Sequence, residues 1–343
     1  MDHILIIRLS AMGDVAMTVP VIRALVSQYP NVKVTVVSRP FFEPFFEDME
    51  RVHFFGADLN NRHKGFAGIY RLFQDLKKLD IRYVADFHDV LRSKILRSFF
   101  KFSGARIAFT DKGRAEKKAL TRSKNKVFLP LKTMVERHAD TLQKLGFRID
   151  LSHPGFPSKH GLPDSLSAIT GIKGYQKWIG IAPFAQHPTK VYPTDLMKDL
   201  IVKLASDPNY KLFLFGGKDE IPQLTEMQQR LPNVQIMAGT VPFREELQLI
   251  RHLDVMLSMD SGNAHIAAMY GVSVISLWGH THPYAGFAPF HQPSENAFTA
   301  DRSQYPLIPT SVYGNKEVPG YEDAMRTITP ESVIERIIFT LNT

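Results

Sequence analysis

The first candidate for chemistry is a lone carboxylate, Asp14, at the end of the segment Leu9-Ser10-Ala11-Met12-Gly13-Asp14. A carboxylate in such a loop could accept a proton from a substrate hydroxyl, which is the role of a general base. Asp is also among the residues preferred at a helix N-cap, and the apolar periodicity of a helix follows it directly. The residues alone allow both interpretations, and capping is the commoner one.

The second candidate is the segment Asp260-Ser261-Gly262-Asn263-Ala264-His265. Small residues at a helix start leave backbone N–H groups open to an anion, at the positive end of the helix dipole. Ser261 and Gly262 would let a phosphate approach closely, and Asp260 and His265 flank the same point. The pattern is also an ordinary capping sequence, so it predicts a helix start as readily as a phosphate site.

Two further loops add a cation and an acid. Lys190 lies in the turn-rich segment 183–193 and could neutralise a diphosphate as a point charge, although an exposed loop lysine is commoner. Glu220 follows a Gly-Gly pair and could bind ribose hydroxyls, or only complement a helix dipole.

No motif for a metal or a redox cofactor accompanies these residues, and we expect no cofactor. The chain has no cysteine, no D-x-D and no H-E-x-x-H, so neither a thiolate site nor a metal-bridged diphosphate is indicated. His280 and His282 lack a third ligand at a suitable spacing. The first loop has only Gly13 where a dinucleotide site requires G-x-G-x-x-G, which argues against an oxidoreductase.

The elements that must position these loops alternate between strand and helix patterns. Strands are predicted at 4–8, 33–38, 83–87, 178–182, 211–215, 254–259 and 272–277. Helices are predicted at 15–29, up to 102, and at 193–206, 221–230, 245–252 and 262–270. Strands joined by helices form parallel sheets, and ligands bind beyond their carboxyl ends. We therefore expect α/β architecture with two doubly wound, Rossmann-like domains, 1–160 and 161–329, facing an interdomain cleft, and a helix at 330–343 that could pack on either.

Length and composition limit the class of protein. The 343 residues are 44% hydrophobic and 22% charged, which is typical of a globular chain with two domains. The chain starts with a short apolar run without a basic leader, which predicts a buried strand rather than a signal peptide. No apolar stretch is long enough to span a membrane. Together with the lack of cysteine, this predicts a soluble cytoplasmic protein.

Positive charge is concentrated in the first half of the chain. Residues 1–160 contain 28 Lys and Arg against 16 Asp and Glu, a net charge of +12, while the whole chain carries +8. Most of the excess lies between Arg92 and Lys126. Such a run could attract substrate phosphates, anionic lipid headgroups or nucleic acid, or form only a solvated surface. Nucleic acid is the least favoured, because no binding motif or aromatic platform accompanies the charge.

The order and spacing of the motifs resemble glycosyltransferase family 9, which contains the ADP-heptose:lipopolysaccharide heptosyltransferases. The resemblance rests on the opening segment 4–20 (ILIIRLSAMGDVAMTVP), on 86–93 (DFHDVLRS), and on 260–265 (DSGNAH) through Trp278-Gly279 and Pro283. It implies a GT-B fold with the acceptor on the first domain and the nucleotide sugar on the second. It also implies an inverting, metal-independent enzyme of lipopolysaccharide core biosynthesis, cytoplasmic or peripheral at the inner face of the inner membrane.

By position, the resemblance assigns Asp14 as catalytic base and Lys190 as the diphosphate-binding lysine, and we expect Arg92 to contact the anionic acceptor. It implies donor contacts from Glu220, Asp260, Ser261, Gly262 and His265. Ala185 and Gln186 stand where many heptosyltransferases have threonines, which leaves some phosphate contacts unassigned.

The reaction implied is a single displacement from a nucleotide sugar such as ADP-heptose to the anionic inner core on lipid A. Asp14 would deprotonate the acceptor hydroxyl, while Lys190 and the helix start at Ser261 stabilise the departing diphosphate. Two alternatives stay open. A nucleotide-sugar epimerase of the same fold would need no lipid acceptor, and a non-catalytic nucleotide-sugar-binding protein would bind donor without turnover.

Overall fold

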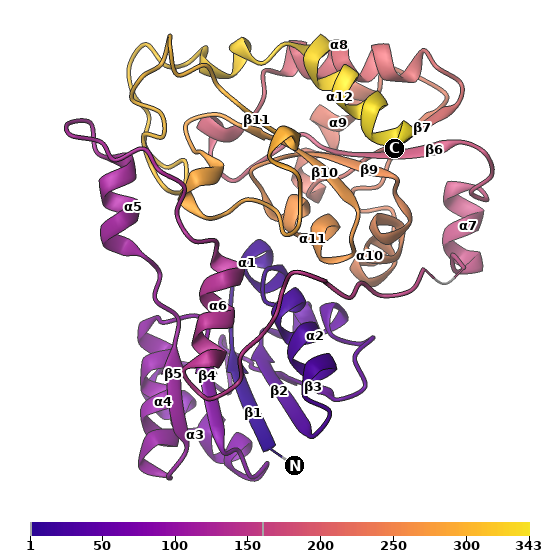
Figure 1. Ribbon diagram of the computed structural model, residues 1–343. Helices are drawn as coiled ribbons and strands as arrows, with labels where there is room; N and C mark the ends of the chain where they lie inside the picture. The colour runs from indigo at the N-terminus through magenta and orange to yellow at the C-terminus, as the bar shows by residue number, and fades with distance from the viewer. Residues whose placement is uncertain (1, 160) are drawn as a thin grey trace. The chain divides into compact units, whose positions relative to one another are not determined.

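The computed structural model describes residues 2–159 and 161–343, and the chain divides into two compact units. Unit 1 comprises Met1–Lys112 and Lys132–Pro157, and unit 2 comprises Gly113–Leu131 and Ser158–Thr343. Each unit contains one wholly parallel β-sheet with helices on both faces (Figure 1). The alternating pattern of strands and helices therefore predicted the architecture of both sheets correctly.

The sheet of unit 1 has five strands in the order β3-β2-β1-β4-β5. They are β1 (Asp2–Ile7), β2 (Val32–Ser38), β3 (Val52–Gly56), β4 (Tyr83–Asp86) and β5 (Arg106–Phe109). Helices α3 (Gly65–Lys77) and α4 (Leu91–Phe102) pack on one face, where their apolar residues join Leu5 and Ile7 in a common core. Helices α2 (Val19–Gln28) and α6 (Met134–Gln143) contact each other and cover the other face. Coverage on both faces explains why β1 is apolar from Ile4 to Ile7.

One predicted helix of unit 1 is in fact two. The sequence pattern predicts a helix at 15–29, whereas the structure has α1 (Met12–Ala16) and then α2, with a break at Met17 and Thr18. Pro20 causes the break, because its ring would clash with the carbonyl of Ala16 in a continuous helix. Pro20 instead lies in the first turn of α2, where it is tolerated.

The sheet of unit 2 has six strands in the order β11-β10-β9-β6-β7-β8. They are β6 (Lys177–Ala182), β7 (Tyr210–Leu214), β8 (Val234–Ile236), β9 (Val255–Met259), β10 (Ser273–Trp278) and β11 (Ala297–Thr299). The helices are α7 (Asp164–Thr170), α8 (Thr194–Ala205), α9 (Ile221–Gln228), α10 (Phe243–His252), α11 (Gly262–Met269) and α12 (Pro330–Asn342).

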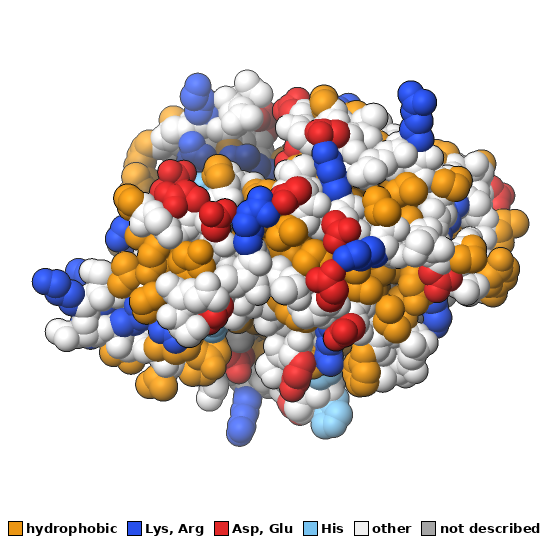
Figure 2. Space-filling model, turned by 90° about the horizontal axis from the view of Figure 1, so that it is seen from above, with side chains coloured by type: hydrophobic (Ala, Val, Ile, Leu, Met, Phe, Trp, Pro, Cys, Tyr) orange, Lys and Arg blue, Asp and Glu red, His pale blue; other side chains and the backbone are white. Residues whose placement is uncertain are grey.

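The last helix, α12, packs on unit 2. Its residues Val333, Ile337 and Leu341 belong to the same core as residues of α8 and β10. The outer face on which α8 and α12 lie carries interspersed acidic and basic side chains (Figure 2). Several of these are paired, for example Lys203 with Glu331.

The predicted division at residue 160 places residues 113–131, which we call the arm, in the first domain, whereas in the structure they group with unit 2. The arm contains α5 (Arg114–Thr121) and belongs to unit 2, and the chain returns to unit 1 at Lys132. Lys126 Nζ donates to the carbonyls of Leu307 and Pro309 at 2.9 and 2.7 Å, and the guanidinium of Arg302 stacks on Phe128 at 3.4 Å. These contacts with residues more than 150 positions away could not be inferred from local patterns.

The arm also divides the basic run between the two units. Unit 1 contains 21 Lys and Arg against 15 Asp and Glu, a net charge of +6, and unit 2 contains 21 against 19, a net charge of +2. Lys117 of the arm is buried against the ring of Phe287. The run is therefore not one continuous solvated surface.

Candidate functional site

The loops with the candidate residues leave the carboxyl ends of the strands in each unit. In unit 1, the loop after β1 leads to Asp14 and the loop after β4 leads to Arg92. In unit 2, Lys190, Glu220 and the segment 260–265 follow β6, β7 and β9. Each set therefore lies at the sheet edge where ligands of parallel α/β domains bind.

Asp14 occupies the third position of α1, not its N-cap, which is Ala11. Its Oδ2 accepts the backbone N–H of Ala11 at 3.3 Å, so the carboxylate completes the first turn from inside the helix. The side chain is 31% exposed. Among the described residues of unit 1, both contacts of the carboxylate go to Oδ2, so Oδ1 is open to a substrate hydroxyl.

Arg8, directly after β1, holds Asp14 in place. One guanidinium nitrogen lies 2.5 Å from Asp14 Oδ2, while the others donate to the carbonyls of Ser10 at 2.8 Å and Phe87 at 2.9 Å. Arg8 is buried, so these bonds tie the loop after β1 to the loop after β4. Sequence reasoning missed this role, and the available signal was a cation at the end of an apolar strand.

His88 lies next to this pair as a neutral group. Burial, and then the nearby charge of Arg8, lowers the pKa of His88 to about 3. Its Nδ1 accepts the N–H of Leu9 at 3.3 Å. Near neutral pH, His88 therefore adds a hydrogen-bond acceptor to the loop and no charge.

Arg92 is exposed in the first turn of α4 and forms no ion pair within the described part of unit 1. Arg97, also on α4, is paired within the fold, since it binds Asp86 at 2.8 Å and Asp89 at 3.1 Å. Asp86 is fully buried and also accepts the N–H groups of His88 and Asp89. The two aspartates therefore shape the turn after β4, and Arg92 stays available to an anionic ligand.

In unit 2, Lys190 and Asp260 form an ion pair. Nζ of Lys190 lies 3.0 Å from Oδ2 of Asp260, and the two side chains are only 13% and 9% exposed. Thr281, in the loop after β10, donates to the same Oδ2 at 2.8 Å. The structure thus joins two residues predicted separately and adds Thr281, which sequence reasoning missed.

The backbone around Lys190 is fixed by two glycines. A Cβ on Gly279 would collide with the carbonyl of Thr189, and the N–H of His280 donates to that carbonyl at 3.1 Å. Gly314, with φ of +81°, lies against the aliphatic stem of Lys190. A larger residue at either glycine would displace the short helix η2 (Pro188–Lys190) and its lysine.

The start of α11 is open. Ser261 is the N-cap residue, but its side chain does not cap the helix, and its hydroxyl bonds that of Ser258 at 3.0 Å. The first N–H groups of a helix have no partner inside it, so those beginning at Gly262 can receive an anion. His265 lies one turn further along and is buried.

Glu220 is not grouped with these residues by any contact in the described parts of unit 2. Its carboxylate accepts the N–H of Gly217 at 2.6 Å and packs over Gly216, where an added Cβ would lie 2.8 Å from Oε2. In this structure, Glu220 shapes the loop after β7.

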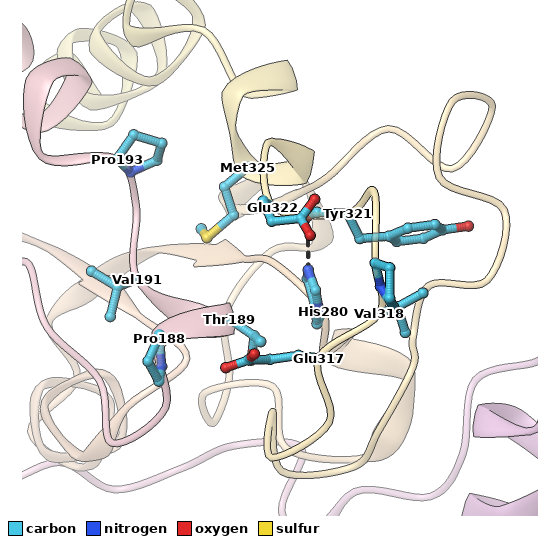
Figure 3. Close-up of a pocket in the computed structure, with 11 residues that line it drawn as sticks. Pro188, Thr189, Val191, Pro193, His280, Glu317, Val318, Tyr321, Glu322 and Met325 are labelled. Carbon is cyan, nitrogen blue, oxygen red and sulfur yellow. Dashed lines mark hydrogen bonds between the residues drawn. The ribbon is translucent and has the colours of Figure 1, made fainter.

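A pocket of about 450 Å³ in unit 2 is lined by residues on either side of Lys190 but not by Lys190 itself (Figure 3). Nε2 of His280 donates to the carbonyl of Tyr321 at 2.9 Å inside it. None of the predicted donor-binding residues lines this pocket. Across residues 2–159 and 161–343, no three His, Asp or Glu side chains are grouped as a metal site requires.

Residues 69–316, more than half of the chain, match the family model described as glycosyltransferase family 9 (heptosyltransferase). The chain belongs to glycosyltransferase family 9. It is 26% identical to lipooligosaccharide heptosyltransferase 2 of Haemophilus influenzae over 363 aligned residues, which cover 98% of each chain. It is 25% identical to lipopolysaccharide heptosyltransferase 3 of Escherichia coli over 280 residues, 78% of this chain and 81% of that one.

The fold of the chain matches that of a solved heptosyltransferase. The solved structure of E. coli ADP-heptose lipopolysaccharide heptosyltransferase II matches with a TM-score of 0.72 at 19% identity, covering 100% of this chain and 99% of that one. This likeness confirms the GT-B fold of this family 9 chain. Within the part of the chain that the structure describes, no helix is long and apolar enough to cross a bilayer.

Proposed function

We propose that this family 9 glycosyltransferase is an inverting enzyme that transfers heptose from ADP-heptose to the inner core of lipopolysaccharide. The observation that carries the proposal is the Lys190–Asp260 ion pair in the same strand-end layer as the open start of α11. A fixed cation and free helix N–H groups are what a leaving diphosphate requires. The relatives are lipopolysaccharide and lipooligosaccharide heptosyltransferases, which supports heptose as the sugar and lipopolysaccharide as the acceptor.

On the donor side, the diphosphate would bind the N–H groups at Ser261 and Gly262 and the ammonium of Lys190. Asp260 keeps that ammonium in position through Oδ2. Its Oδ1 has no hydrogen-bond partner among the described residues of unit 2, and we propose that it accepts a hydroxyl of the donor. Glu220 and His265 stay proposed donor contacts.

On the acceptor side, Asp14 would take the proton of the attacking hydroxyl on its open Oδ1. The acceptor oxygen then forms a bond to the anomeric carbon as the bond from that carbon to the diphosphate breaks. ADP leaves as the anion, with its new charge stabilised in unit 2, and the anomeric configuration is inverted. Arg92 would bind a phosphate of the acceptor. No step uses a metal ion.

The test is transfer to a heptose-deficient, lipid A-linked acceptor. We expect ADP release that depends on acceptor, and an acceptor mass increased by one heptose. An epimerase would convert the donor without acceptor, and a non-catalytic binding protein would bind ADP-heptose without releasing ADP in the presence of any acceptor. Either result would contradict the proposal.

A further inference from the structure

The outer layer of unit 1, formed by α3 and α4, exposes large apolar side chains. Leu91 and Phe102 of α4 are 74% and 89% exposed, and Phe66 of α3 is 67% exposed. Single exposed apolar residues are ordinary on protein surfaces, but contiguous ones mark an interaction site. These three lie on two helices that pack directly against each other.

The apolar residues form a stripe on the solvent side of α4. At about 100° per residue, the exposed Leu91 and Phe102 project within about 20° of each other, and Ile95 beside them is half-buried and packs against the core. Leu96 and Phe100, which are buried in the core, project from the opposite side of the helix. Helix α4 therefore has an apolar inner face for the core and, at Leu91 and Phe102, a stripe of exposed apolar side chains that the core does not bury.

Aromatic contacts join α3 and α4 within this layer. The ring of Phe99 on α4 lies 5.8 Å from that of Phe66 and 5.4 Å from that of Tyr70, both on α3, in edge-to-face geometry. Phe73, which is buried, supports the cluster from below at 5.5 Å from Phe99. The exposed rings of Phe66 and Tyr70 thus contact Phe99 and join the two helices at this point.

The surroundings of the stripe are basic. Helix α4 contains four Lys and Arg and no acid, and the single acid of α3, Asp75, is paired with Arg62. Arg97 turns inward to Asp86. The exposed cations on the two helices are Arg71, Lys77, Arg92 and Lys101. The interspersed, paired charges on the outer face of α8 and α12 provide a contrast (Figure 2).

We propose that this α3–α4 surface, composed of Phe66, Tyr70, Leu91, Phe99 and Phe102 with the exposed cations around them, docks unit 1 on a bilayer containing anionic lipid. Cations attract the headgroups, and aromatic and aliphatic side chains enter the interfacial zone, the combination found in membrane-surface helices. The charge of the surface fits anionic lipid, and the apolar stripe fits the acyl boundary. The inference rests on the proposed function in one respect, because the lipid-linked acceptor of that reaction would lie in such a bilayer.

The binding test omits donor and acceptor. Wild-type protein is sedimented with phosphatidylglycerol-containing vesicles and with phosphatidylcholine vesicles, and we expect binding to the former that falls with salt. The variant Phe66→Ser/Leu91→Ser/Phe102→Ser should lose at least about fivefold in bound fraction. The matched control Ile172→Ser/Tyr175→Ser removes two exposed apolar residues of unit 2, 88% and 82% exposed, and should bind as wild type. Arg71→Gln/Lys101→Gln should weaken binding and flatten its salt dependence.

A second measurement covers the case in which the triple variant unfolds. The chain has no cysteine, so Phe102→Cys and Ile172→Cys each provide one labelling site for an environment-sensitive dye. Anionic vesicles should shift the emission of the dye at position 102 to the blue and leave that at position 172 unchanged. The proposal would be overturned by equal shifts at both sites or by no shift at either. It would also be overturned if the folded triple variant bound vesicles as wild type does, or if the protein retained a protein partner and bound no vesicles.

Failure of the docking surface can be told from failure of the proposed function. The triple variant should transfer heptose to a water-soluble acceptor fragment at the wild-type rate and lose transfer to acceptor embedded in vesicles. A protein that binds vesicles but transfers to no acceptor would refute the proposed function alone.

Discussion

Asp260 binds Lys190 and Thr281 through a single carboxylate oxygen, at 3.0 and 2.8 Å. A loop lysine would ordinarily be a mobile point charge. Here the carboxylate, together with the close approach of Gly279 and Gly314, gives the ammonium one position before any diphosphate arrives. Positioning of this kind lowers the reorganisation needed to stabilise a leaving group.

Because Lys190 and Asp260 form an ion pair, we expect substitutions of the two residues to lower donor affinity in a non-additive way. Lys190→Gln should weaken ADP binding roughly 10- to 100-fold, the scale of a lost charge-assisted hydrogen bond. Asp260→Asn should weaken it less, and the double variant should match Lys190→Gln, because both changes remove one interaction. Titration calorimetry with ADP measures each Kd, with the exposed Lys144→Gln of unit 1 as control. Strictly additive losses would show that the two residues act independently.

The variant Asp14→Asn distinguishes a structural role of the Asp14 carboxylate from a catalytic one. Asn retains an oxygen for the Ala11 N–H, so the variant should fold with a modest fall in melting temperature from the lost Arg8 pair. An amide cannot act as a general base, so turnover should fall roughly 10²- to 10⁴-fold. ADP affinity should be unchanged, because the proposed diphosphate contacts are in unit 2. Near-normal turnover would leave Asp14 as a first-turn acid, and the base would have to be another residue.

Turnover should not depend on a divalent metal. The proposed leaving-group site uses Lys190 and the α11 backbone, the roles that a metal has in other transferases. Purified enzyme should therefore keep its rate in excess chelator and show no gain with Mg²⁺ or Mn²⁺. Activity lost in chelator and restored by either ion would disprove this prediction.

Attachment of the arm should weaken in acid. Burial, with further contributions from Arg302 and Lys126, lowers the pKa of His282 to about 4, and its ring contacts Phe128 at 4.9 Å. Once the arm is released, the imidazole regains its ordinary pKa near 6.5 and takes up a proton. The free energy of release therefore falls as pH drops from about 6.5 to 4, by up to about 1.4 kcal/mol per unit.

Hydrogen exchange of the α5 amides at several pH values measures this slope. His282→Asn keeps an acceptor for the N–H of Tyr284 and cannot be protonated, so its slope should be flatter. An unchanged slope in the variant would assign the pH dependence to another group.

The sequence by itself determined the architecture and the position of the candidate site in each unit. Apolar runs such as 4–7 and 255–259 alternate with helical periodicity, which leaves few arrangements other than parallel sheets, and loops after parallel strands share one edge. The positions of Asp14, Lys190 and Asp260 followed from that rule, because each is placed by a short local connection.

Only the tertiary structure decided the contacts between distant segments. The pair between Lys190 and Asp260, the anchoring of Asp14 by Arg8 and the docking of the arm on unit 2 each join parts of the fold whose approach no local periodicity encodes. The exposed apolar stripe of α4 could not be predicted from the sequence, for a related reason. Apolar residues cover about half of the circumference of this helix at about 100° per residue, and only packing against the sheet shows which of them the core buries and which it leaves at the surface.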